Sequence, residues 1–128
     1  MSYNNPCLDL EIKLAANIKK LTDSVKGSND PFFNALKNQI ARSITSIPLN
    51  TAESEIVLGT ERQRISKLQI ANGELNESQA NLRILIEMGF IDGNDPLAKE
   101  CISDMAAIRA ILSKSLNTLY NKSRRREE

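Results

Sequence analysis

Histidine and tryptophan are absent from this chain of 128 residues, and aromatic side chains make up only 4% of it. The lack of histidine removes the commonest general acid–base and the commonest metal ligand. The two cysteines, Cys7 and Cys101, lie far apart and form no Cys-x-x-Cys pair, so no zinc site is expected. The sequence therefore predicts a protein without a metal, a cofactor or enzymatic activity.

Long apolar runs are also missing. No stretch approaches the ~20 residues needed to span a bilayer, and the polar N-terminus, residues 1–6, contains no apolar targeting region. We therefore expect a cytoplasmic protein that does not contact membranes. Seventeen Lys and Arg against sixteen Asp and Glu leave a net charge of +1. The chain as a whole has no strong attraction to nucleic acids, and any basic patch must be local.

Glycine and proline number only five and four, and they punctuate the sequence at residues 26–31, 59–61 and 92–96. Gly27 suits the position after a helix, whereas Pro31 and Pro96 suit the first turn of one. Thr60 is a candidate N-cap. These signals divide the chain into four segments.

Within each segment, apolar residues recur at steps of three and four, which is the spacing of one helix face. Four amphipathic helices joined by short loops are antiparallel neighbours. The sequence thus predicts an all-α protein, an up-down-up-down antiparallel four-helix bundle with a single domain over residues 1–128. The expected elements are helices at about 8–26, 31–58, 61–89 and 95–122 and a frayed charged tail at 123–128.

Two residues interrupt the helical pattern. Pro48 should kink the second helix, because its ring clashes with a carbonyl one turn earlier. Gly73 lies inside the third helix, where glycine costs ~1 kcal/mol relative to alanine. We expect a close helix crossing at Gly73, with a ligand-binding role as the alternative.

Two stretches resemble the signatures of a small bacterial family of four-helix bundle proteins. The first is residues 39–53, with Ser46-Ile47 followed by Asn50-x-Ala52-Glu53, and the second is Ala71-Asn72-Gly73 with the helix that follows. The family includes proteins encoded in intervening sequences of bacterial large-subunit ribosomal RNA genes. It is similar to the accessory variability protein of diversity-generating retroelements.

This resemblance implies a homo-oligomer, a pentameric barrel of bundles, that binds RNA or DNA and a reverse transcriptase. It also singles out Asn50 and Glu53, whose spacing of three places them on one helix face. They are candidates for a polar site facing a partner or RNA. The alternative is a hydrogen-bonded pair near Pro48.

Two clusters of basic residues are candidates for nucleic-acid binding. Arg62, Arg64 and Lys67 open the third helix, and Arg124, Arg125 and Arg126 lie near the end of the chain. The structural alternatives are a solvated charged face and cations that complement a helix dipole.

Several isoleucines lie off the main apolar stripes and favour self-association, because soluble monomers avoid large exposed apolar patches. We therefore expect a non-catalytic oligomeric accessory protein that binds nucleic acid. The first alternative is a protein–protein scaffold without nucleic-acid affinity, and the second is a bundle that binds a small molecule. The isoleucines concerned are Ile70, Ile84 and Ile86 in the third helix and Ile102 and Ile111 in the fourth.

Overall fold

The computed structural model describes residues 5–26, 29–56 and 60–127, of which residues 56, 126 and 127 are described by their backbone alone. It contains α1 (Pro6–Asp23), α2 (Pro31–Ile56), α3 (Glu61–Glu87) and α4 (Pro96–Glu127), and these described residues include no strand. The prediction of an all-α four-helix bundle is confirmed.

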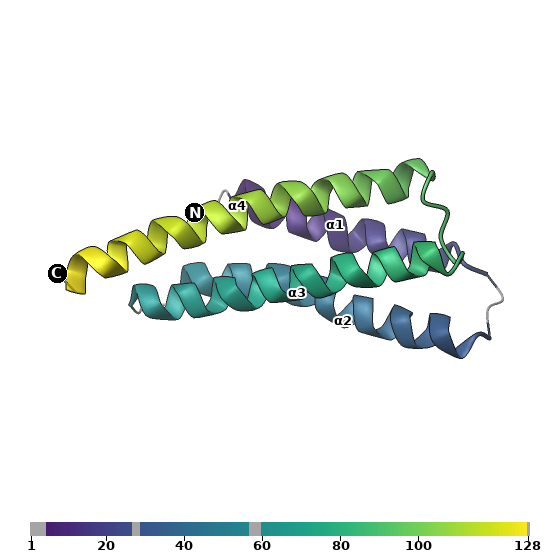
Figure 1. Ribbon diagram of the computed structural model, residues 1–128, viewed down its shortest axis with the longest axis horizontal. Helices are drawn as coiled ribbons and strands as arrows, with labels where there is room; N and C mark the ends of the chain where they lie inside the picture. The colour runs from purple at the N-terminus through teal and green to yellow at the C-terminus, as the bar shows by residue number, and fades with distance from the viewer. Residues whose placement is uncertain (1–4, 27–28, 57–59, 128) are drawn as a thin grey trace.

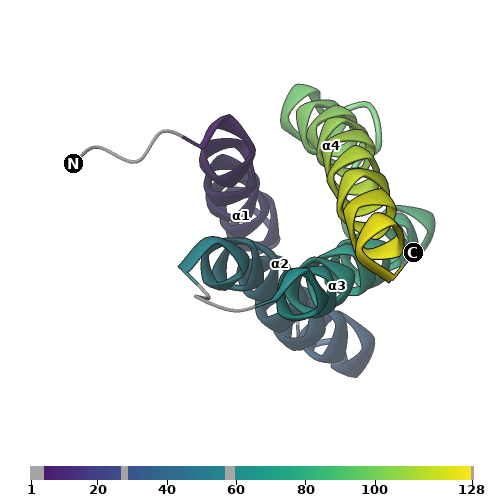
Figure 2. The ribbon, with the colours of Figure 1, turned by 90° about the vertical axis from the view of Figure 1, so that its left-hand side faces the viewer.

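The helices lie side by side with successive helices running in opposite directions (Figure 1). Helix α1 packs against α2 and α4, and α3 packs against the same two helices. Viewed along the bundle, α2 and α3 lie next to each other on one side, with α1 above α2 and α4 above α3 (Figure 2). Helix α4 is the longest at 32 residues, and its last turns extend past the start of α3 and well beyond the start of α1 (Figure 1).

Three of the helices begin with an Asn-Pro or Asp-Pro pair. The side-chain oxygen of Asn5 accepts a hydrogen bond from the Leu8 amide at 3.1 Å, which caps α1. Asp30 and Asp95 accept in the same way at the starts of α2 and α4. The proline that follows each of them has no N–H to leave unpaired in the first turn. Thr60 occupies the N-cap of α3 without a capping hydrogen bond from its side chain.

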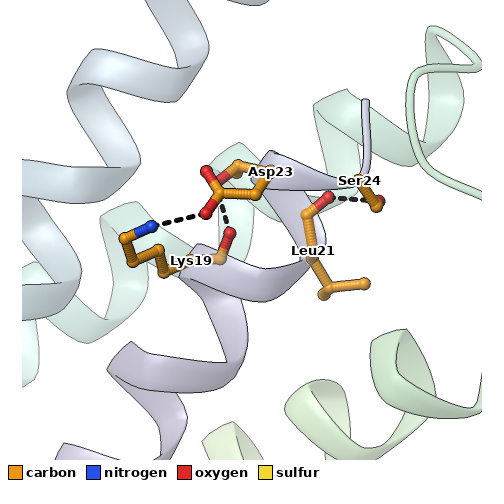
Figure 3. A network of polar contacts seen from close by, with 5 residues as sticks. Lys19, Leu21, Asp23 and Ser24 are labelled. Atoms are coloured by element: carbon orange, nitrogen blue, oxygen red, sulfur yellow. Dashed lines mark hydrogen bonds and ion pairs between the residues drawn. The ribbon is translucent and has the colours of Figure 1, made fainter. Parts of the chain in front are cut away.

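The end of α1 is held by short-range polar contacts. The Ser24 hydroxyl donates to the Leu21 carbonyl at 2.6 Å, and Lys19 Nζ pairs with Asp23 Oδ2 at 2.5 Å (Figure 3). The Lys19 ammonium lowers the pKa of the Asp23 carboxyl. The Ser24 hydroxyl adds a second hydrogen bond to the Leu21 carbonyl, which also accepts from the Ser24 amide, and the ion pair links two side chains one helical turn apart.

The core consists of one apolar stripe from each helix, as expected from the spacing in the sequence. The largest side chains in it are almost completely removed from solvent, and their burial supplies the main favourable free energy of folding. They are Leu14, Ile40, Ile44, Ile47, Leu75, Leu82, Leu85, Met105, Ile108 and Leu112.

Some expectations from the sequence are wrong. The tail at 123–128 was expected to be frayed, but α4 continues through residue 127. Gly73 is exposed, and a Cβ placed there would meet no other atom within 4 Å, so no close helix crossing requires glycine. By contrast, helix α2 continues through Pro48 to Ile56, within the helix predicted at about 31–58, and the kink expected at Pro48 stays a prediction. Gly27, predicted to follow the first helix, and residues 57–58, predicted to end the second, lie outside the described residues.

Candidate nucleic-acid interface

The fold brings the two basic clusters to the same end of the bundle. Arg62, Arg64 and Lys67 lie in the first two turns of α3, and Arg124 and Arg125 lie near the end of α4. Figures 1 and 2 show these two helix ends at the same extremity of the molecule. The side chain of Arg126 lies outside the described part of the chain. We call residues 53–56, 60–69 and 114–125 the basic end.

The cations of α3 point in different directions. Lys67 Nζ forms an ion pair with Glu53 Oε2 of α2 at 2.7 Å. Arg64 lines an open groove together with residues of α2 and α4. Arg62 is exposed and lies two residues before Arg64, so the two side chains leave the helix about 200° apart. The three candidates therefore do not form one surface.

The groove that Arg64 lines is formed by α2, α3 and α4 and has a volume of about 510 Å³. Lys114 of α4 contributes a second cation, and Glu55 of α2 contributes a carboxylate. Asn5 Nδ2 donates to Glu55 Oε1 at 2.7 Å, which joins the start of α1 to the edge of the groove. Burial raises the pKa of Glu55, while the Arg64 guanidinium acts in the opposite direction.

The two polar residues of the family signature have separate partners. Asn50 Nδ2 donates to both the carbonyl and the hydroxyl oxygen of Ser46 at 2.9 Å, within α2. Glu53 is exposed and pairs with Lys67 of α3. The alternative interpretation, a hydrogen bond between Asn50 and Glu53, is therefore wrong: Asn50 bonds within α2, and Glu53 joins α2 to α3.

A buried carboxyl group is the main feature that the sequence interpretation missed. Glu11 of α1 is 0% exposed, and its Oε2 accepts hydrogen bonds from Thr51 of α2 at 3.0 Å and from the Cys7 thiol at 3.6 Å. Its buried Oε1 has no hydrogen-bond partner. Burial raises the pKa of Glu11 from 4.5 to about 7, although both hydrogen bonds favour the charged form.

The two thiols are also buried. Burial raises the pKa of Cys7 to about 12, with the Glu11 carboxyl adding to the effect. Burial likewise raises the pKa of Cys101 to about 11. Both cysteines are therefore protonated at neutral pH and behave as small apolar residues, as expected from the sequence.

The part of the chain that the structure describes holds no group of three or more His, Cys, Asp or Glu side chains that could bind a metal ion. None of its helices is both long and apolar enough to cross a membrane.

Off-stripe isoleucines show mixed exposure. Ile70, Ile84, Ile102 and Ile111 are exposed as expected, whereas Ile86 is partly buried against the core. Adding a Cβ to Gly93 would bring it within 3.1 Å of the Ile86 side chain, which shows how closely the α3–α4 turn covers this residue.

Known proteins provide a family assignment. A family model described as 23S rRNA-intervening sequence protein matches residues 5–114. The chain is also similar to the crystal structure of a protein of unknown function from the S23 ribosomal protein family of Bacteroides thetaiotaomicron. The two share 27% sequence identity with a TM-score of 0.73, and the similarity covers 86% of this chain and 97% of that one. No curated protein matches the chain.

The family match spans α1, α2, α3 and most of α4, and it stops before the last turns of α4. It includes both stretches on which the resemblance to the four-helix bundle family was based. The chain belongs to the 23S rRNA-intervening sequence protein family.

Proposed function

We propose that this chain is a non-catalytic, oligomeric accessory protein that binds RNA or DNA through its basic end. The observation that carries the proposal is the convergence of α3 and α4, which places cations about 60 residues apart in the sequence at one end of the bundle. Arg64 and Lys114 line a groove there that is wide open to solvent. Phosphate contacts from such cations supply sequence-independent affinity for nucleic acids.

Assembly would strengthen this binding, because repeated weak contacts add through effective concentration. The family resemblance suggests a pentamer and a reverse transcriptase of a diversity-generating retroelement as the protein partner. A non-catalytic role agrees with the placement of the most perturbed titratable groups. Glu11 and the thiol of Cys7 are buried within the bundle, away from any substrate.

Nucleic-acid binding can be tested by fluorescence anisotropy with labelled RNA and DNA at ~50 mM salt, where screening is weak. Replacing Arg124, Arg125 and Arg126 with Ala should weaken binding and flatten its salt dependence. On duplex DNA, each lost phosphate contact changes the slope of the logarithm of the binding constant against the logarithm of the salt concentration by about 0.9. The matched control replaces three cations outside the basic end with Ala, so the net charge changes equally while affinity stays unchanged. These control residues are Lys20, Lys26 and Lys99.

A protein–protein scaffold without nucleic-acid affinity is the second candidate. Exposed apolar side chains on α3 and α4 favour it. Ile84 and Ile102 lie in two adjoining surface hollows, which share Ala80 and Arg83 in their linings. If the intact protein binds neither RNA nor DNA at ~50 mM salt, the nucleic-acid proposal is wrong and the scaffold takes its place.

Self-association is measurable by light scattering. We expect a particle several times the 14.3 kDa mass of one chain. Replacing Ile84 and Ile102 with Glu should reduce the particle size, because charges would replace apolar contacts. A 14.3 kDa particle for the unmodified protein at micromolar concentration would contradict oligomerisation.

A further inference from the structure

Tyr120 is an exposed aromatic residue held in a fixed position at the basic end. It lies in the last third of α4 and is 40% exposed. Its hydroxyl oxygen accepts a hydrogen bond from Gln69 Nε2 of α3. The polar edge of the ring is thus tied to the neighbouring helix, while much of the ring remains available to solvent.

The surroundings of Tyr120 are polar. Asn117, Asn121, Ser123 and Arg124 line a shallow hollow with it on α4. Asn117 lies three residues before Tyr120 and Arg124 lies four residues after it, so both adjoin the ring on one helix face. This environment differs from that of an apolar protein-binding site, where an exposed ring is surrounded by other apolar side chains.

A further cation, Arg62, shares a helix face of α3 with Gln69. Arg62 precedes Gln69 by seven residues, which is two helical turns, so it shares the helix face from which Gln69 reaches Tyr120. Arg62 and Arg124 are both exposed. The ring therefore lies on a surface that carries one cation from each of the two helices.

We propose that Tyr120 is a stacking platform for an unpaired base of a single-stranded nucleic acid. The amides of Asn117 and Asn121 can hydrogen-bond the edge of the stacked base, and Arg124 and Arg62 can contact the adjoining phosphates. A single strand is favoured over a duplex, because the bases of a duplex are stacked on one another and offer no free face. This inference rests on the proposed nucleic-acid function and names the form of nucleic acid that it recognises.

The composition of the chain makes the proposal directly measurable. The protein has no Trp and two Tyr, so Tyr3→Phe leaves Tyr120 as the sole source of tyrosine fluorescence. The test is a titration of this variant with a 12-nucleotide oligo(U) strand and, separately, with a duplex of equal length. Stacking should quench the emission on addition of the single strand, whereas the duplex should leave it nearly unchanged.

Substitutions then separate the ring from its hydroxyl group. Tyr120→Leu removes the stacking face and should weaken single-strand binding about tenfold, while duplex binding stays within about twofold. Tyr120→Phe keeps the face and should retain nearly all of the affinity. The matched control is Phe32→Leu, which removes an equally simple ring that is 62% exposed in the first turn of α2 and should have no effect.

The outcomes distinguish this inference from the proposed function. Salt-sensitive single-strand binding that Tyr120→Leu leaves intact, without quenching, overturns the stacking site but not the proposed function. A loss as large in Tyr120→Phe as in Tyr120→Leu assigns the effect to the bond with Gln69 and also overturns stacking. Failure of both single strand and duplex to bind at ~50 mM salt overturns the proposed function itself.

If Tyr120→Leu alters the helix content or the particle size, ultraviolet cross-linking of the unmodified protein to oligo(U) provides the decisive measurement. A cross-linked peptide containing Tyr120 supports the site. Cross-links confined to other peptides contradict it.

Discussion

At the end of the bundle where α3 turns into α4, apolar side chains close the fold. Phe90, in this turn, packs on Phe33 of α2 with ring centroids 5.3 Å apart, and Ile91 is buried next to it in the sequence. At the basic end, Leu68 and Leu116 are also buried, but a polar contact between Gln69 and Tyr120 joins α3 to α4 as well, and the groove that Leu68 lines is open to solvent. We call residues 19–26, 29–37 and 83–100 the closed end.

Charge follows the same division. The closed end is balanced, whereas the basic end carries seven cations and three carboxylates among its described residues. The two ends therefore differ in net charge and in the contacts that join α3 to α4, although both carry many charged residues. At the closed end the charged residues are Lys19, Lys20, Asp23, Lys26, Asp30, Lys37, Arg83, Glu87, Asp92, Asp95, Lys99 and Glu100, and at the basic end they are Glu53, Glu55, Glu61, Arg62, Arg64, Lys67, Lys114, Lys122, Arg124 and Arg125.

The largest difference between the ends should appear when one leucine is truncated in each. Leu85→Ala removes a side chain that is 0% exposed at the closed end and should lower the free energy of unfolding by about 3–4 kcal/mol. Leu116→Ala, at the basic end, should cost about 1–2 kcal/mol, because solvent reaches the space that it leaves. Urea denaturation followed by circular dichroism measures both. Equal losses would contradict the division into two differently packed ends.

Glu11 lies in the second turn of α1, where Thr51 of α2 donates a hydrogen bond to it. Its pKa of about 7 in the folded protein, against 4.5 when unfolded, means that the folded state holds the proton more tightly. Stability should be greatest below about pH 4.5 and should fall as the pH rises to about 7, by roughly 2–3 kcal/mol from this group.

Glu11→Gln should remove that decline, because the amide stays neutral and can still accept the hydrogen bond from Thr51. Urea midpoints measured between pH 4.5 and 8 provide the comparison, with Glu53→Gln as an exposed control. A decline that persists in Glu11→Gln would show that another group controls the pH dependence.

Two glycines should respond in opposite directions to alanine. Gly89 has a φ of +83° in the turn of the closed end, so Gly89→Ala should destabilise the protein by about 1 kcal/mol. Gly73 has helical neighbours and open space around a Cβ, so Gly73→Ala should stabilise it by about 0.5–1 kcal/mol. Thermal melts of the two variants test this prediction, and destabilisation by both would restore the close-crossing interpretation of Gly73.

The smallest effect concerns the ion pair between Lys67 and Glu53. Both side chains are partly exposed, so their coupling should be about 0.5 kcal/mol and should weaken with added salt. A double-mutant cycle of Lys67→Met and Glu53→Gln measures it. A coupling above about 2 kcal/mol would show that the basic end relies on ion pairs for its packing.

The type and order of the helices could be predicted because apolar spacing and capping pairs are local signals. The helical end of α4 is hard to predict, because a run of charged residues is compatible both with a frayed tail and with a helix. Arg, Lys and Glu are in fact good helix formers, and residues 122–127 are rich in them. Gly73 was misread because an interior glycine does not by itself show what lies next to it.

The candidate site was only partly predictable. The basic clusters are visible in the sequence, but which of their side chains share a surface depends on how α3 and α4 pack. Lys114 was missed for this reason, since only the packed helices place it opposite Arg64. Glu11 could have been found, because Cys7, Glu11 and Leu14 have the same spacing as the core stripe.

The two protonated, buried thiols make the molecule a reporter of its own local opening. A thiol reagent can modify them only when the surrounding helix moves aside, so each labelling rate measures the free energy of a different opening event. Cys7 lies in the first turn of α1, whereas Cys101 is completely buried in the second turn of α4. Labelling of Cys7 well before Cys101 would show that α1 leaves the bundle while α4 stays in place.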